Sequence, residues 1–135
     1  QGYSSAASDV YKRQAAVRTK LVALQRGLAK KTDVIMDGRD IGTTVLPDAF
    51  AKIYLTASSD ARAKRRYDEL KEKGENRSFD AIKEDIEKRD YEDMHRAISP
   101  LKQADDAVLV DTSDMNIEQV VAVLSKIIDE KKAGR

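Results

Sequence analysis

Arginine and aspartate side chains occur together at three places in this chain of 135 residues, and each place could bind an anion. The first is Asp37-Gly38-Arg39-Asp40, in which the glycine permits a tight turn and Arg39 can donate two parallel hydrogen bonds to a phosphate. Asp40 can accept a hydrogen bond from an amine, and Asp37 can face a metal ion or a metal-bound water. The alternative is an ordinary turn, because Asp-Gly is common in turns.

The second place is a helical segment that carries Arg62, Arg65 and Arg66 at positions i, i+3 and i+4, which predicts one shared face. Like charges at this spacing destabilise a helix by roughly 0.2–0.5 kcal/mol per pair, and a bound phosphate would reverse that effect. The alternative is a solvent-exposed basic face that neighbouring carboxylates neutralise in part. Those carboxylates belong to Asp60, Asp68 and Glu69.

The third place is Arg89, Asp93 and Arg96, at positions i, i+4 and i+7 of a predicted helix. One interpretation is a ladder of alternating charges, in which each pair contributes a few tenths of a kcal/mol. The other is a binding surface for a phosphate and a sugar hydroxyl, with Asp93 holding both arginines in place. Their spacing is compatible with both interpretations.

Helices and strands must bring these three places together. Apolar spacing and capping residues predict four helices, at 15–31, from Ser58 or Ser59 to about Lys73, from Ser78 to about Ala97, and from Asn116 onward. Short apolar runs predict buried strands at 33–36, 51–56 and 107–110. This alternation indicates an α/β fold with a short parallel sheet flanked by helices, its strands buried on both faces. In such sheets ligands bind beyond the carboxyl ends of the strands, where 37–40 follows 33–36.

Composition excludes several classes of protein. Twenty-five Lys and Arg residues against 24 Asp and Glu residues leave no overall field to hold a nucleic acid or an anionic membrane. Without cysteine there is no disulfide and no thiol catalysis. No apolar run approaches the roughly 20 residues of a membrane span. Since there is also no signal-peptide pattern, we expect a cytoplasmic protein.

We expect residues 1–14 to be disordered or foreign to the domain, which then covers 15–135. The stretch QGYSSAASDVYKRQ has no helical or strand period and looks like a translated cloning remnant, the alternative being a frayed helix start. Three strands make a thin sheet and the chain does not begin with Met, so we expect a fragment whose further strands lie upstream.

Four motifs, in their order and spacing, closely resemble bacterial cytidylate kinases over about 15–131. They are DGRDIGT, the helix ARAKRR, RDYEDMHR and PLKQADDA. The resemblance implies a P-loop NTPase-type three-layer fold, present here only in part, and transfer of the γ-phosphoryl group of ATP to CMP or dCMP with Mg²⁺. It also implies that the intact protein is a monomer whose partners are these small nucleotides, without nucleic acid or membrane.

Roles for individual residues follow from the same resemblance. Arg18 would read the cytosine together with Asp40, and Arg39 and Arg96 would hold the acceptor phosphate. Apart from the resemblance, the carboxylate of Asp37 stays the candidate to face a metal ion through a water.

The remaining arginines take two roles by the same resemblance. Arg89 and Asp93 would contact the sugar and fix the phosphate-binding arginines. Arg62, Arg65 and Arg66 would belong to a mobile lid that closes over the transferred phosphoryl group and excludes water.

The sequence departs from such kinases in one important motif. A phosphate-binding P-loop requires a Gly-Lys pair, and this chain has none. We therefore expect the chain by itself to be inactive and its parent protein to be the enzyme. Two alternatives stay open, a related P-loop kinase for another small acceptor and a non-enzymatic α/β interaction module.

Overall fold

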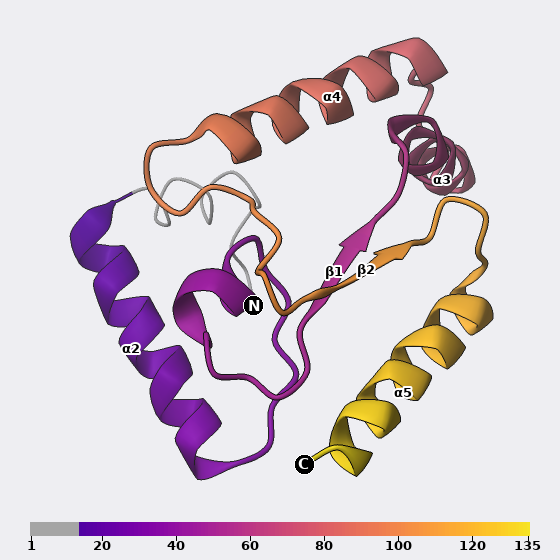
Figure 1. The fold of residues 1–135 in the computed structure, drawn as a ribbon. Coiled ribbons are helices and arrows are strands. Elements are labelled where there is room, and N and C mark those ends of the chain that lie inside the picture. Colours follow the sequence, from indigo (N-terminus) through magenta and orange to yellow (C-terminus); the bar gives the residue numbers. More distant parts are fainter. Residues whose placement is uncertain (1–13) are drawn as a thin grey trace.

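The computed structural model describes residues 14–135, so the prediction for 1–14 falls, apart from Gln14, outside the described residues. The elements are α2 (Ala15–Lys31), the π-helix η1 (Ile41–Val45), β1 (Ile53–Thr56), α3 (Ser59–Glu72), α4 (Phe79–His95), β2 (Val108–Asp111) and α5 (Ile117–Ala133). β1 and β2 pair in parallel, with Ile53 opposite Val108. Helices lie around this pair (Figure 1), so the predicted α/β fold with a short parallel sheet is confirmed.

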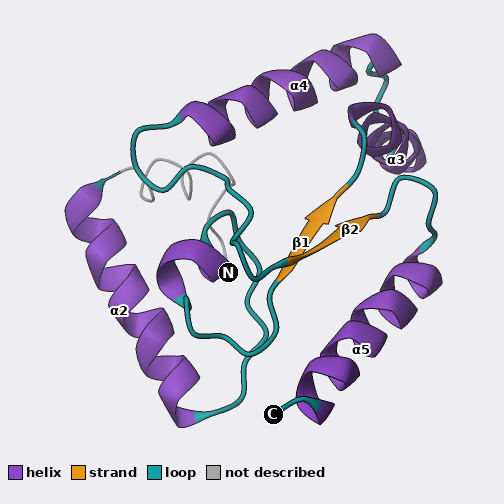
Figure 2. Ribbon diagram, viewed as in Figure 1, coloured by secondary structure: helices purple, strands orange, loops and turns teal. Residues whose placement is uncertain are grey.

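Loop segments, η1 and the two strands occupy the middle of the molecule, and α2, α3, α4 and α5 lie around them (Figure 2). The long connection between α2 and β1 contains η1, which lies beside α2. The connection between α4 and β2 returns through the same region (Figure 1). Residues that are distant in sequence therefore meet near η1.

The helix ends follow the predicted caps. Ser58 accepts a hydrogen bond from the amide of Ala61 and begins α3, and Ser78 begins α4 in the same way. Asn116 forms a capping box with Gln119 at the start of α5. None of the helices within 14–135 is long and apolar enough to cross a membrane.

α4 ends at His95, two residues before the predicted end, because Arg96 already has an extended backbone. The predicted end assumed that only Pro100 would stop the helix. Just beyond, Ser99 has a φ of 50°, a left-handed conformation that is uncommon for a residue other than glycine.

The best-packed apolar cluster among the described residues lies between α3 and α4, away from the sheet. Its buried members are Ala63, Leu70 and Ile82. Tyr67, Phe79 and Ile86 pack against them. This cluster makes α3 and α4 a stable helical pair, and it positions the charged end of α4.

Two predictions about strands are wrong. Residues 33–36 form no strand, and Ile35 is 95% exposed. A strand needs a hydrogen-bonded neighbour and apolar cover, and within 14–135 the only ladder joins β1 to β2. The two strands are not buried on both faces either, since Leu55 and Leu109 are more than half exposed.

Candidate functional site

One small pocket brings together charged residues from three distant segments. It has a volume of about 70 Å³ and lies between α2, the segment 37–41 and Arg96. Its lining residues are Arg18, Leu21, Val22, Gln25, Asp37, Gly38, Arg39, Asp40, Ile41, Val45 and Arg96. The structure therefore brings together the predicted base-reading and phosphate-binding residues, which the sequence alone places up to 78 residues apart.

Arg18 and Asp40 form the most enclosed ion pair of this pocket. Nη2 of Arg18 donates to Oδ2 of Asp40, and the two side chains are only 14% and 8% exposed. Because water and salt screen such a pair little, each charge depends on the other or on a ligand of matching polarity. A ligand that replaces this contact must offer an acceptor to Arg18 and a donor to Asp40.

The π-helix η1 fixes the backbone of Asp40. The carbonyl of Asp40 accepts hydrogen bonds from the amides of Thr44, at 2.9 Å, and Val45, at 3.3 Å. π-Helical turns are rare and are frequent at functional sites. At Gly38 an added Cβ would lie 2.8 Å from Cγ1 of Ile41, so glycine is needed for the close approach of η1.

Asp93 holds one of the two predicted phosphate-binding arginines. Nε of Arg39 lies 2.8 Å from Oδ2 of Asp93, and both side chains are 19% exposed. This contact joins the segment 37–40 to the last turns of α4. Neither Asp93 nor Arg89, which is exposed one turn earlier on α4, is among the residues that line the pocket.

Arg96 is placed where its positive charge is disfavoured. Burial lowers the pKa of its guanidinium, and the nearby charge of Arg39 lowers it further, while Asp40 and Asp93 offset this in part. Its Nε donates to the carbonyl of Ser99 at 2.6 Å. Two guanidinium groups that repel each other in one pocket are a favourable arrangement for binding an anion.

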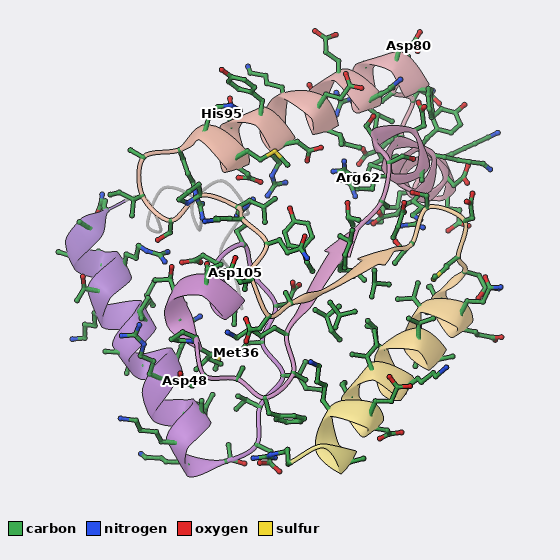
Figure 3. The ribbon with its side chains drawn as sticks, in the orientation of Figure 1. Met36, Asp48, Arg62, Asp80, His95 and Asp105 are labelled. Carbon is green, nitrogen blue, oxygen red and sulfur yellow. The ribbon has the colours of Figure 1, made fainter. Side chains whose placement is uncertain are left out.

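Arg62 does not reach this pocket. It makes a two-bond contact with Asp90 of α4, at 2.8 and 2.6 Å, and its Nε donates to the carbonyl of Ala57. Figure 3 shows Arg62 between α3 and α4. The hydrogen bond to Asp90 raises the pKa of Arg62. In this structure Arg62 therefore joins two helices.

The other two arginines of α3 also find separate partners. Arg65 donates to the carbonyl of Thr112 and, at 3.4 Å, to that of Met115, whereas Arg66 pairs with Glu69 at 2.9 Å. In this structure the three guanidinium groups contact separate acceptors, and a shared anion-binding face for Arg62, Arg65 and Arg66 stays a prediction. Each guanidinium group has an acceptor within reach, as the neutralised-face interpretation expected for Arg66.

A second hollow, of about 280 Å³, lies at the turn between α3 and α4. It is lined by Tyr67, Lys71, Glu75, Asn76, Arg77 and Ser78. It contains none of the predicted site residues, and its Arg77 is already paired with Asp85. The smaller pocket beside η1 is therefore the candidate site.

Comparison with known proteins identifies the family. Residues 2–130 match the family model described as Cytidylate kinase. The chain belongs to the cytidylate kinase family. It is 56% identical over 116 residues to the cytidylate kinase of Lactobacillus johnsonii, covering 86% of this chain and 50% of that protein. The cytidylate kinase of Thermosipho melanesiensis is 47% identical over 121 residues, which is 90% of this chain and 56% of that protein. The chain thus spans about half the length of the curated relatives it matches.

The described residues of this cytidylate kinase family member do not fit a triphosphate-binding site. Both strand-to-helix connections, Ala57-Ser58 and 112–116, lack glycine, and the chain has no Gly-Lys pair. Asp37 is exposed and lines the pocket, but no group of three or more His, Asp or Glu residues within 14–135 could hold a metal ion. The described residues therefore contain no glycine-rich, phosphate-binding loop for a triphosphate.

Sequence reasoning missed two cations that contact the segment following Asp40. Arg26 of α2 donates to the carbonyls of Thr44 and Val45, and the buried Lys52 pairs with Asp106 at 2.9 Å. The spacing of Arg26, eight residues after Arg18, was a weak signal, because positions eight apart differ by about 80° around a helix and so share only a broad face. Lys52 gave no signal, since it stands alone beside an apolar run.

Proposed function

We propose that this chain supplies the acceptor side of an enzyme that transfers the γ-phosphoryl group of ATP to CMP or dCMP. Membership of the cytidylate kinase family supports the reaction, and the pocket beside η1 supports the assignment of the acceptor side. Residues 15–135 form this part in the proposal. We expect the 135-residue chain alone to be inactive, because its sequence has no Gly-Lys pair to form a phosphate-binding loop.

The observation that carries the proposal is the enclosed pair of Arg18 and Asp40 beside two further guanidinium groups. The amine at C4 of cytosine donates a hydrogen bond, which a carboxylate can accept. The adjacent N3 and the O2 carbonyl accept hydrogen bonds, which a guanidinium donates. Uracil has an acceptor in place of the amine and would meet the carboxylate of Asp40 with repulsion.

The phosphate of the nucleotide would lie between Arg39 and Arg96. Its negative charge would offset the burial and the charge of Arg39, which lower the pKa of Arg96, and this favours binding of the phosphate. Phosphoryl transfer depends mainly on positioning and charge stabilisation, which these two arginines can supply. Arg89 and Asp93 would contact the sugar and keep Arg39 oriented.

The rest of the proposed machinery concerns the donor side. Arg62, Arg65 and Arg66 would exchange their present partners for the transferred phosphoryl group when a lid closes. Asp37 would contact Mg²⁺ through a water.

The proposal is tested by isothermal titration of the 135-residue chain with CMP, UMP, AMP and sulfate. We expect CMP to bind more tightly than UMP or AMP. Asp40→Asn should weaken CMP binding by about tenfold or more, because a hydrogen bond to a charged group contributes about 1.5–3 kcal/mol. The exposed Asp48→Asn, outside the pocket, is the matched control and should change nothing.

The other outcomes separate the alternatives. Equal affinity for all three nucleotides, or equal losses for all of them in Asp40→Asn, would indicate a related kinase for a different acceptor. If no nucleotide binds and none raises the melting temperature, the chain is a non-enzymatic module and the proposal is overturned.

A further inference from the structure

Two cations outside the pocket hold the same stretch of backbone. Nε and Nη2 of Arg26 donate to the carbonyls of Val45, at 2.9 Å, and Thr44, at 2.6 Å. Nζ of Lys52 donates to the carbonyl of Pro47, two residues further on. Arg26 belongs to α2 and Lys52 directly precedes β1, so η1 and the turn after it are fixed from two parts of the fold.

These contacts supply hydrogen-bond donors to carbonyl groups at the end of η1. The last carbonyls of any helix lack partners within the helix and carry partial negative charge. The planar fork of Arg26 satisfies two successive carbonyls together, which the single ammonium of a lysine does less well. Val45 itself is buried, so the end of η1 is anchored both by its side chain and by its carbonyl.

η1 lies beside α2 (Figure 1), and two arginines of α2 contact its two ends. Arg18 binds the side chain of Asp40 at the start of η1, and Arg26 binds the carbonyls at its end. The two arginines are eight residues, or about 12 Å, apart along the helix axis. The amides of Thr44 and Val45 donate in turn to the carbonyl of Asp40, so a single peptide segment links Arg26 to the backbone of Asp40.

We propose that Arg26 is a positioning residue that sets the preference for cytosine. It does not line the pocket, and it acts by fixing η1 so that the carboxylate of Asp40 faces the base. This inference rests on the proposed function and deepens it, since it concerns the same acceptor site. Without Arg26 the end of η1 loses two hydrogen bonds, so the backbone of Asp40 is less well fixed and the amine of cytosine meets a less precisely placed acceptor.

The consequence is specific to base recognition. The two phosphate-binding arginines are positioned by other contacts, Arg39 by Asp93 and Arg96 by the carbonyl of Ser99. Phosphate binding therefore does not depend on Arg26. A purely structural role would weaken the binding of all nucleotides alike. A positioning role lowers the ratio of CMP affinity to UMP affinity.

The test measures CMP and UMP binding to the 135-residue chain and to three variants. Arg26→Ala should lower the CMP to UMP affinity ratio by about tenfold, since small misplacements in a preorganised site are costly. Arg26→Lys, which restores one charged donor, should recover part of the ratio. Lys30→Ala, which removes an exposed cation of the same helix, should leave the ratio unchanged.

Hydrogen exchange gives a second readout that needs no ligand. The amides of Thr44, Val45 and Leu46 should exchange faster in Arg26→Ala, whereas those within α4 should not change. An unchanged affinity ratio, or unchanged exchange at η1, would overturn the inference and leave the proposed function standing. If the unchanged chain does not distinguish CMP from UMP, the proposed function fails and this inference fails with it.

Discussion

Arg96 has an unfavourable environment for its positive charge and yet a well-defined position in the pocket. Burial and the charge of Arg39 lower the pKa of Arg96, yet a hydrogen bond to the carbonyl of Ser99 holds its guanidinium in place. A group that gains little in the unliganded protein is free to contribute its charge to a ligand. This arrangement of Arg96 favours ligand binding more than it favours the stability of the unliganded protein.

Replacing Arg96 tests this division between binding and stability. Arg96→Gln should weaken CMP binding by roughly ten- to a hundredfold, because it removes a charged donor, whose contribution is about 1.5–3 kcal/mol. The binding of cytidine, which has no phosphate, should change little, and the free energy of unfolding should not fall. Titration calorimetry and urea unfolding measure these effects, with Arg77→Gln as the control outside the pocket. A matching loss for cytidine would place Arg96 at the base and not at the phosphate.

At the scale of elements, local signals in the sequence predicted the helices well. Ser58, Ser78 and Asn116 act as caps in the structure, because a cap depends only on the next three residues. The strand predicted at 33–36 failed because a strand depends on neighbours that local pattern does not specify. The contact of Arg26 with η1 was missed for the same reason.

In the candidate site, too, some contacts could be predicted from the sequence and others depend on how the elements pack. The motif around Asp40 and the pair of Arg39 with Asp93 were expected from the resemblance. Composition and spacing alone left ordinary turns and charge ladders open. The separate partners of Arg62 and Arg65 could not be predicted, because Asp90 and Thr112 come from elements whose packing the spacing does not encode.

The helical pair α3–α4 should carry more of the stability than α5. Ile82 of α4 is 2% exposed in the main apolar cluster, whereas Ile117 of α5 is 82% exposed. Ile82→Ala should lower the free energy of unfolding by about 2–5 kcal/mol, and Ile117→Ala by well under 1 kcal/mol. Urea unfolding of the 135-residue chain measures both. Similar losses in the two variants would show that α5 is packed as closely as α4.

At the scale of the whole molecule, ion pairs connect elements that are distant in the sequence. Neither α2 nor α5 has a buried residue. The long-range pairs among residues 14–135 are Arg18–Asp40, Arg39–Asp93, Lys52–Asp106 and, between α3 and α4, Arg62–Asp90 and Lys83–Asp60. Two of them join α2 and α4 to the segment around η1, and one joins the start of β1 to the loop before β2. The fold as a whole should therefore respond to pH.

The direction of that response follows from carboxylates on the surface. Hydrogen bonds to Lys52 lower the pKa of Asp106 below 3.8, and bonds to Ser113 do the same for Asp111. A lowered pKa contributes stability that is present above the ordinary value and is lost as the pH falls through the lowered one. We expect constant stability from about pH 5 to 8 and a decline below about pH 4.

Asp106→Asn should reduce that decline, because Lys52 then has no titrating partner, whereas the neighbouring Asp105→Asn should reduce it less. Thermal unfolding from pH 2.5 to 8 measures the effect, and identical profiles for both variants would contradict this account of Lys52 and Asp106.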